Sequence, residues 1–556
     1  MSLNGPGGSL FLSPYNSRVS SSIWIQRLTL VIGAVLLLGL FSQQSSDPDF
    51  WWHLKTGQYL VEQHRLPVPD PFAYTTSMGI PAYSGEERVR HFNLTHEWLA
   101  EILMWLVYSV AGFAGLVLTR ATLLTALCFV VGWIAFRRTQ QFWWAVLAGI
   151  GTASVAVWFA ADRPALLTFL MVAGFIAICE SGRALWLLPV LSVIWANCHG
   201  GFFLGWIVLG AYWLVDKRLR WIAPVAVLAS GLNPNFFGVV LTLLDYRSSY
   251  LTSTLTEWKR PYLWGPPYAF DVLLYLCAAV LLVARKRVRL VDWVLFGLFA
   301  VAALTAFRNI LLVGIVAPVL IAAYFPWKLP SWAGPLVSCL AAAIAVWQGG
   351  FFRLAPAEWA YPKGAADFLQ AHPGPGKLWN TWEYGGYLIW RLGPQQKVFI
   401  DGRALNESVY KDYQKMLYSG ERDALFAKYG TGTVVLNGFE YGSGALYPVV
   451  LTMGDPGNTT WKLVFEDPQA LVFMRDLPAG VQAIPKAQRV IDHLESECAT
   501  HIEHDPTLPL CARALADLSI KAGDKARARR MLALYLEHTS EKDPVAQRAL
   551  RSLIPE

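Results

Sequence analysis

Long apolar runs separated by short polar loops make up most of the chain between residues 23 and 350. We interpret these runs as membrane helices, since about 20 apolar residues cross a hydrocarbon core of roughly 30 Å, although several runs are shorter. Basic residues favour cytoplasmic loops, and eleven spans place all three strongly basic loops, 137–138, 217–220 and 285–289, on that side. The expected spans are residues 23–42, 113–136, 142–161, 164–180, 186–199, 201–216, 221–235, 269–284, 290–307, 309–325 and 333–350.

The charge pattern also predicts the orientation of the chain. Residues 1–22 form a polar segment with Arg18 as its one charged residue, and no clear cleavage site follows the first span, so we expect an uncleaved helix with a cytoplasmic N-terminus. Everything after residue 350 then lies outside. Reading the runs around His199-Gly200-Gly201 as one helix would place 285–289 outside, so two spans are preferred.

Two outer loops are expected within the membrane region, 23–350. The first, 43–112, is long and carries Asp47-Pro48-Asp49 directly after the first span. Its residues 97–111 have the length and composition of an amphipathic helix lying in the membrane interface. The second outer loop is 235–268.

The pattern changes to that of a soluble protein after residue 350, and residues 351–480 are expected to form a small α/β domain. Two stretches, 364–372 and 409–429, have the composition of helices. Short apolar runs bounded by turn residues predict strands at 377–380, 386–390, 397–400, 432–436 and 470–474.

The last segment, 481–556, is expected to be helical throughout. Residues 512–524 and 526–535 resemble one tetratricopeptide hairpin. One hairpin cannot bury a solenoid core, so the tail should pack on the preceding domain, and its free face is a candidate surface for a protein partner. Cys498 and Cys511 lie on consecutive predicted helices, and a disulfide and two free thiols both remain open.

Composition supports a membrane protein. The chain has 556 residues, of which 55% are hydrophobic and only 15% charged, too apolar for a soluble protein of this size. Its 25 tryptophans suit contact with membrane lipids at the interfaces. The net charge of +7 lies largely in short loops, so it requires no nucleic acid.

Polar residues gather at the outer ends of the expected spans. Each has a simple structural explanation by itself: Asp162-Arg163 could be a turn ion pair, and Asn233-Pro234 a helix stop. Together they predict an outward-facing polar cleft. Charged groups at a membrane border are energetically unfavourable unless water solvates them, so such groups commonly belong to a functional site. The set is Asp47, Asp49, His53, Asp162, Arg163, Asn197, His199, Asn233, Arg308 and Asn309.

This set suits glycosyl transfer from a lipid-phosphate donor. Such a reaction needs a base for the acceptor, which Asp47 or Asp49 could supply. It also needs a fixed cation for the leaving phosphate, which Arg163 or Arg308 could supply. The two carboxylates could instead hold a divalent metal such as Mg²⁺ or Mn²⁺. An acidic pair is a weak motif, and simple capping of the loop would also explain it.

Five sequence features resemble the GT-C superfamily of polytopic glycosyltransferases, in a bacterial branch of uncharacterised proteins. The resemblance spans residues 20–440 and implies a polyprenyl- or dolichyl-phosphate sugar donor, with a first-loop acidic residue as catalytic base or metal ligand. The oligosaccharyltransferase signature Trp-Trp-Asp is missing, which favours transfer of a single sugar. The features are Asp47–Gly57 (DPDFWWHLKTG), Arg163-Pro164, Asn197–Gly201, Asn233-Pro234, and Tyr384–Trp390 through Asp401-Gly402-Arg403.

The last of these features has a simpler interpretation, which we prefer: Asp401-Gly402-Arg403 is a turn that needs the positive φ of glycine, with Asp401 paired to Arg403. An acceptor-facing edge is the alternative.

The expected function is therefore inverting sugar transfer on the outer face of a bacterial cytoplasmic membrane, with a periplasmic C-terminal domain. A catalytically silent scaffold that binds partners through its outer parts is the main alternative. A transporter of lipid-linked sugars is disfavoured, because the chain has no clear repeats and its polar groups lie at one face and not the midplane.

Overall fold

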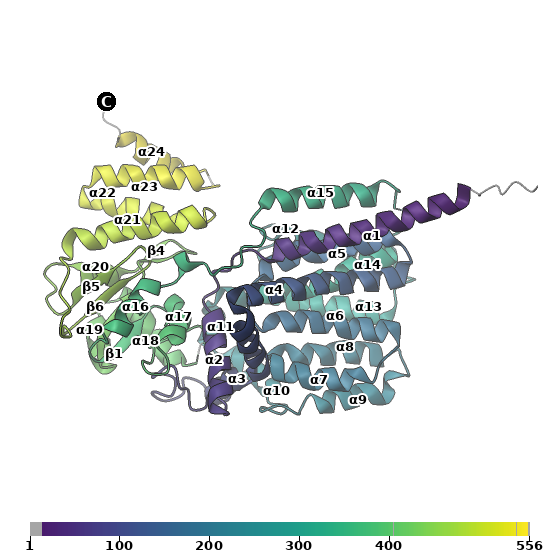
Figure 1. Cartoon of the computed structure of the whole chain (residues 1–556), viewed down its shortest axis with the longest axis horizontal. Coiled ribbons are helices and arrows are strands. Elements are labelled where there is room, and N and C mark those ends of the chain that lie inside the picture. Colours follow the sequence, from purple (N-terminus) through teal and green to yellow (C-terminus); the bar gives the residue numbers. More distant parts are fainter. Residues whose placement is uncertain (1–13, 328, 404, 541, 554–556) are drawn as a thin grey trace, which may run out of the picture.

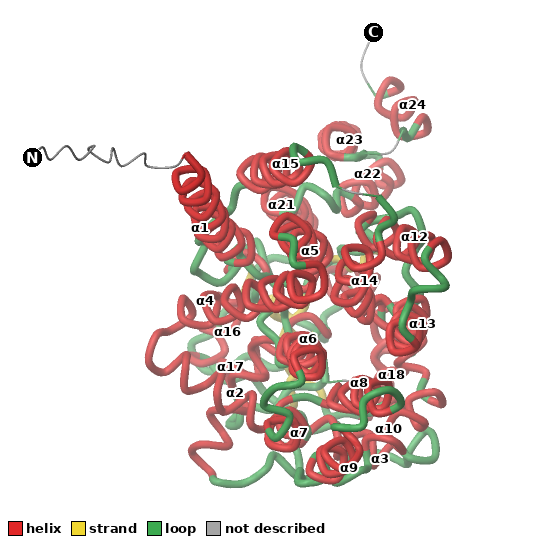
Figure 2. Tube along the Cα trace, turned by 90° about the vertical axis from the view of Figure 1, so that its right-hand side faces the viewer, coloured by secondary structure: helices red, strands yellow, loops and turns green. Residues whose placement is uncertain are grey.

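A computed structural model of the protein describes residues 14–327, 329–403, 405–540 and 542–553. Apolar helices lie side by side in one bundle, and a small sheet with its helices lies at one end of that bundle (Figure 1). Turned by 90°, the view runs along the bundle, so helices such as α6 and α9 are seen end on (Figure 2). Most of the expected cytoplasmic segment 1–22 lies outside the described residues.

The bundle helices coincide with the eleven expected apolar segments. Four helical stretches of 18 residues or more are apolar enough to cross a membrane, Ile23–Phe41, Glu86–Thr139, Phe142–Phe159 and Phe307–Tyr324, and seven shorter apolar helices accompany them. The number that spans stays a prediction. The bundle helices are α1 (Pro14–Phe41), α4 (Trp98–Thr139), α5 (Phe142–Ala156), α6 (Ala165–Ser181), α7 (Leu187–Cys198), α8 (Phe203–Trp213), α9 (Leu219–Ala229), α12 (Tyr268–Val283), α13 (Leu290–Thr305), α14 (Ile310–Tyr324) and α15 (Ala333–Gln348).

Two breaks in the bundle fall where the sequence predicts them. Gly112, with φ 61° and ψ −157°, divides α4 into the expected helix of the outer loop and the expected span. His199 is extended, with φ −165° and ψ 142°, so α7 and α8 are separate helices. The short helix η2 (Gly200–Phe202) connects them.

Short helices of the two outer loops lie across the end of the bundle that faces the sheet. In the first loop, α2 (Phe50–Gln63) and α3 (Glu86–Thr95) lie across the bundle axes, between the bundle and the sheet (Figure 1). The second loop contains α10 (Val239–Asp245), α11 (Tyr250–Thr254) and η4 (Thr256–Trp258).

The α/β region, residues 351–480, contains a four-stranded sheet of order β1-β2-β6-β5. Strand β1 (Lys377–Asn380) runs parallel to β2 (Thr431–Leu436), whereas β6 (Leu471–Met474) pairs antiparallel with β2 and with β5 (Lys462–Glu466). All six residues of β2 are buried, as expected of a central strand. The region also contains a hairpin, five α-helices and the short helix η6: β3 (Phe439–Glu440), β4 (Ala445–Leu446), η6 (Glu358–Ala360), α16 (Lys363–Ala371), α17 (Trp382–Leu392), α18 (Glu407–Tyr418), α19 (Arg422–Lys428) and α20 (Pro448–Gly454).

Two of the predicted strands are wrong. Residues 386–390 belong to α17, where Tyr384, Tyr387 and Leu388 are buried at helical spacing, so their apolar run reflects one face of a helix. Residues 397–400 make only an isolated bridge, between Val398 and Ala73 of the first outer loop. The loop therefore packs on the α/β region instead of standing free.

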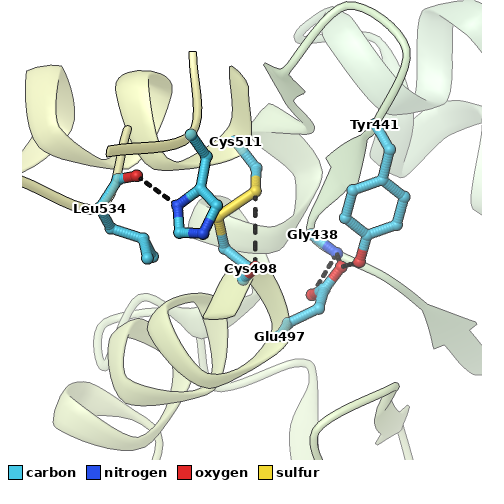
Figure 3. The surroundings of a disulfide bond; sticks show 7 residues. Gly438, Tyr441, Glu497, Cys498, Cys511 and Leu534 are labelled. Carbon is cyan, nitrogen blue, oxygen red and sulfur yellow. Dashed lines mark hydrogen bonds between the residues drawn. A yellow bond between two sulfur atoms is a disulfide. The ribbon is translucent and has the colours of Figure 1, made fainter. Parts of the chain in front are cut away.

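The tail consists of α21 (Ala487–His504), α22 (Leu510–Ala522), α23 (Lys525–His538) and α24 (Pro544–Ser552). A Cys498–Cys511 disulfide joins α21 to α22, which resolves the alternative that the sequence leaves open (Figure 3). Beside it, Glu497 accepts hydrogen bonds from the Gly438 amide and the Tyr441 hydroxyl (Figure 3). The tail thus packs on the α/β region.

Candidate functional site

The two first-loop aspartates share one arginine. Asp49 is the residue that precedes the first turn of α2, and Arg163 lies two residues before the start of α6. Arg163 binds Asp47 through two nitrogens, Nε and Nη2, the second at 2.6 Å from Oδ1. Its third nitrogen, Nη1, is 3.0 Å from Oδ2 of Asp49. One guanidinium therefore links both carboxylates of the acidic pair.

A third carboxylate and a second arginine extend this group toward solvent. Oε2 of Glu257, in η4, is 3.6 Å from Arg163 Nη1, and its Oε1 is 3.4 Å from Nη1 of Arg308. Arg308 also lies over the Trp258 ring, 4.5 Å from its centroid. We call Asp47, Asp49, Arg163, Glu257 and Arg308 the carboxylate–arginine cluster. Its Asp47 side chain is 5% exposed and its Glu257 side chain 43%, so the cluster opens at Glu257.

The two aspartates differ in proton affinity. Burial raises the pKa of Asp47, but the charge and hydrogen bonds of Arg163 outweigh it, so the pKa is lowered overall. Burial also raises the pKa of Asp49, to about 6, because the single contact with Arg163 offsets it less and the Asp47 charge adds to it. Near neutral pH, Asp47 is fixed as an anion, whereas Asp49 can accept and release a proton.

The Glu257→Gln variant should shift the ionisation of Asp49 to lower pH. The charge of Glu257 raises the pKa of Asp49, and its carboxylate also competes for Arg163. Removing that charge favours the ionised form of Asp49. The rate of any reaction that needs ionised Asp49 should therefore fall off at a lower pH in the variant than in the wild type, where the pKa of Asp49 is about 6. Glu62→Gln, at an exposed position near the end of α2, is the control and should leave the limb in place. An upward shift in the Glu257 variant would contradict this electrostatic account.

A divalent metal between Asp47 and Asp49 does not fit this arrangement. Arg163 donates to Asp47 and its Nη1 lies 3.0 Å from Asp49, so its guanidinium lies where a bridging ion would have to bind. In this structure the acidic pair forms an ion-pair network with Arg163, so we derive no chemistry through the alternative Mg²⁺ or Mn²⁺ site there.

A second polar cluster joins α2 to the start of α4. His53 Nδ1 is 3.2 Å from Oε1 of Glu101 and 3.5 Å from Oε2 of Glu97. The other oxygen of Glu97 is 3.3 Å from His96 Nε2 and 3.5 Å from His199 Nε2. We call these five residues the histidine–glutamate cluster. Burial lowers the pKa of His53 to about 4, more strongly than the charge of Glu97 raises it, so His53 is neutral at pH 7.

Hydrogen bonds fix the tautomer of His199. Its Nδ1 accepts from the Gly201 amide at 3.0 Å, so the hydrogen of the neutral ring must be on Nε2, which faces Glu97. Thr168 lies 2.7 Å from the same Nδ1, and its hydroxyl oxygen accepts from Trp195 Nε1, which leaves the hydroxyl hydrogen for His199. His199 thus directs its Nε2–H toward Glu97, whose Oε1 is 3.5 Å away.

Glycines allow the helices and loops of both clusters to approach closely. A Cβ on Gly57 would overlap the carbonyl of Glu101, so glycine is what allows α2 to lie against α4. A Cβ on Gly402 would overlap the Asp49 carboxylate. The expected pairing of Asp401 with Arg403 is present, at 2.7 Å, but Gly402 does not have a positive φ. Glycine at position 402 instead lets the backbone of the α/β region lie close to the Asp49 side chain.

The remaining predicted site residues have structural partners. Asp162 binds Arg120 at 2.6 Å and does not pair with Arg163, while Arg120 also donates to the carbonyls of Phe41 and Gln43, holding the end of α1. Three asparagines hold backbone or helix contacts: Asn197 accepts from Trp98 and donates to Val193 and Leu232, Asn233 donates to Ser230 and Phe236, and Asn309 donates to Ala302.

Four residues of the two clusters are not among the predicted site residues: Glu257, His96, Glu97 and Glu101. A signal for the glutamates exists, because Glu97 and Glu101 are four residues apart, as are His53 and Gly57. Residues at that spacing share a helix face, so two such faces in one loop could have suggested a contact.

Comparison with known proteins identifies a similar fold. No family model and no curated protein matches the chain. A solved structure does match: the apo oligosaccharyltransferase of Archaeoglobus fulgidus has a TM-score of 0.52 and 12% identity, covering 83% of this chain and 76% of that one. The chain has an oligosaccharyltransferase-like fold. The archaeal enzyme AglB from the same organism, in complex with an inhibitory peptide and a dolichol-phosphate, has a TM-score of 0.50 at 12% identity, covering 84% of this chain and 76% of that one.

These likenesses show the fold alone, and that fold agrees with the resemblance to polytopic membrane glycosyltransferases. They agree with a membrane protein that carries several apolar helices and a small sheet. The bacterial branch and the tetratricopeptide character of the tail stay predictions.

Proposed function

We propose that this protein is a glycosyltransferase that moves a sugar from a polyprenyl-phosphate donor to an acceptor on the outer face of a bacterial cytoplasmic membrane. The observation that carries the proposal is the carboxylate–arginine cluster, which combines a proton-accepting carboxylate, Asp49, with an accessible cation, Arg308. The fold supports the donor class, since a neighbour of the same fold was solved with a dolichol-phosphate.

The proposed reaction is a single displacement with inversion. The Asp49 carboxylate removes a proton from the acceptor, whose atom forms a bond to the anomeric carbon as the bond from that carbon to the phosphate oxygen breaks. A base with a pKa of about 6 is largely ionised at pH 7 yet still binds a proton, as general-base catalysis requires. Asp47 keeps Arg163 in place and does not take part in proton transfer.

The leaving polyprenyl phosphate carries negative charge that a fixed cation can stabilise. Arg308 suits this role better than Arg163. The two side chains are about equally exposed, 33% and 32%, but Arg308 has one ion pair at 3.4 Å, to Glu257, whereas Arg163 is held by three carboxylates. A phosphate approaching from the open edge of the cluster would meet Arg308 first.

The proposed orientation of the chain in the membrane rests on its basic loops, which lie at the end of the bundle opposite the carboxylate–arginine cluster. Arg138 and Arg289 lie there and both pair with Asp292, with Arg138 Nη2 at 2.8 Å. Placing this end in the cytoplasm follows the distribution of basic residues. The N-terminus is then cytoplasmic, and the α/β region and tail are periplasmic.

Native mass spectrometry of the purified protein tests the donor and its phosphate site. Wild-type protein in nanodiscs should retain a polyprenyl phosphate or its sugar adduct, and Arg308→Ala should lose at least about tenfold of it, since a hydrogen bond to a charged group contributes about 1.5–3 kcal/mol. Arg353→Ala, at an exposed arginine after the last bundle helix, is the matched control and should retain the lipid. Arg163→Ala is a poor probe, because it leaves three carboxylates without their shared partner.

The mass of the retained adduct also distinguishes one sugar from an assembled glycan. A single hexose would agree with the missing Trp-Trp-Asp signature. Equal lipid retention in wild type and Arg308→Ala would argue against Arg308 as the phosphate ligand. Bulk phospholipid alone in every sample would favour the scaffold hypothesis, in which the tail recruits a protein partner.

A further inference from the structure

The histidine–glutamate cluster takes no part in the proposed transfer, and its charges are unbalanced. Its acidic residues, Glu97 and Glu101, are 8% and 4% exposed. Among the described residues, the ion-pair partners of these two carboxylates are histidines alone, with no lysine or arginine within 4.0 Å. Buried carboxylates are costly unless a cation or hydrogen bonds compensate them. The cluster therefore lacks a permanent positive charge.

We propose that this cluster binds a divalent transition-metal ion through His53 Nδ1, Glu97 Oε2 and Glu101 Oε1. One donor atom from each residue lies within 4.8 Å of the others. Bonds of about 2.0–2.1 Å to a tetrahedral ion place neighbouring donors about 3.3 Å apart. The separations from His53 Nδ1, 3.2 Å to Glu101 and 3.5 Å to Glu97, match that spacing.

The groups behind the ligands are arranged as a metal site requires. Ligating carboxylates in proteins are themselves held by hydrogen bonds. Here His199, with its tautomer fixed by Gly201 and Thr168, directs Nε2–H to the second oxygen of Glu97. His96 Nδ1 donates to the Phe92 carbonyl at 2.8 Å, so its Nε2, 3.3 Å from that same oxygen, can donate to it only when the ring is protonated. Both rings border the oxygen of Glu97 that would not bind the ion, which leaves its Oε2 facing His53.

One imidazole and two carboxylates favour a borderline ion, and Zn²⁺ should bind more tightly than Mn²⁺ by the usual order of affinities. The site would tie α2 to α4, since His53 is on the first helix and both glutamates are at the start of the second. Asp49 directly precedes α2, so the metal would position the proposed base without touching substrate.

Metal content measured by inductively coupled plasma mass spectrometry tests this inference. Protein purified without a histidine tag is equilibrated with Zn²⁺ and desalted, and wild type should retain about one equivalent. Glu101→Gln keeps the shape of the side chain but removes a ligand charge, so it should retain less than a tenth of that amount. Glu62→Gln, also a loss of one carboxylate in the same loop, is the matched control and should retain one equivalent.

A second measurement covers the case in which a ligand variant folds poorly. Added Zn²⁺ should raise the melting temperature of wild type and not that of Glu101→Gln, because only a folded-state ligand stabilises. Thr168→Val removes the hydroxyl behind His199 and should weaken Zn²⁺ binding about 10–100-fold while keeping all three ligands.

Two outcomes would overturn the inference: wild type that retains no Zn²⁺, and a variant Glu101→Gln that retains a full equivalent. Retention by Glu101→Gln with loss in Asp49→Asn would place the ion at the acidic pair instead. Neither measurement uses transfer activity, so their failure leaves the proposed function untouched.

Discussion

An Asp49→Asn variant should lose about 10²–10⁴-fold in transfer rate, the usual contribution of a general base. The asparagine amide keeps the size of the side chain but cannot accept the acceptor's proton. The rate is measured as polyprenyl phosphate released from the donor in membranes that contain the variant. Asp47→Asn is the matched comparison: it should slow transfer less, because Asp47 acts by holding Arg163.

The same pair of variants should change stability in opposite directions. Folding raises the pKa of Asp49 from 3.8 to about 6, so its stabilising contribution is complete below about pH 4 and is lost as the pH rises through 6. At pH 7.5 the neutral asparagine avoids that loss, so we expect the free energy of unfolding of Asp49→Asn to exceed that of the wild type by about 1–3 kcal/mol. The pKa of Asp47 is lowered by Arg163, so Asp47→Asn should destabilise at that pH.

Thermal unfolding in detergent at pH 7.5 and pH 4.5 checks these signs. The advantage of Asp49→Asn should shrink at the lower pH, where wild-type Asp49 is itself mostly protonated. Near-normal transfer by Asp49→Asn together with inactive Asp47→Asn would assign the base to Asp47. Full activity in both variants would remove the carboxylate–arginine cluster from the reaction.

A Gly402→Ala variant should lose about 100-fold in transfer rate while remaining folded. The added Cβ would overlap the Asp49 carboxylate, which must then rotate away from Arg163 Nη1, now at 3.0 Å. The obstacle is the end of a side chain and not backbone, so the cost in stability should be small. A displacement of the base by about 1 Å is enough to cause a loss of this size.

Gly420→Ala is the matched control for this variant. Gly420 is exposed in the same α/β region, and a Cβ there meets no atom within 4 Å. It should leave both transfer and melting temperature unchanged. Unfolding of Gly402→Ala alone would mean that the contact is structural, and unchanged transfer would mean that Asp49 tolerates the displacement or is not the base.

The contact between Gly402 and Asp49 also explains why the α/β region belongs to the site. Nearby, Arg403 binds Asp401 and, at 3.0 Å, Asp70 of the first outer loop, so the turn is fastened to that loop. The region therefore covers the acidic pair, and a Cβ on Gly386 of α17 would overlap the Pro48 carbonyl. An acceptor would therefore have to reach Asp49 from a side that the α/β region leaves open.

The sequence by itself determined the elements of the bundle. Helices are present at all eleven segments where apolar runs bounded by charge predict them. Hydrophobicity and loop charge are local properties of the sequence, so they can be recognised without knowing how the helices pack. The breaks at Gly112 and His199 were readable for the same reason. The strand predicted at 386–390 failed because a short apolar run fits a strand and one face of a helix equally well.

Tertiary structure alone decided the partners of the charged groups. Asp47 and Arg163 are 116 residues apart, and no local pattern shows that Arg163 joins Asp47 to Asp49 while Asp162 binds Arg120. The same holds for Glu257 and for the histidine–glutamate cluster, whose members come from three separate segments. Charge pairing depends on distances of a few ångströms between helices, and only the packing of those helices sets such distances.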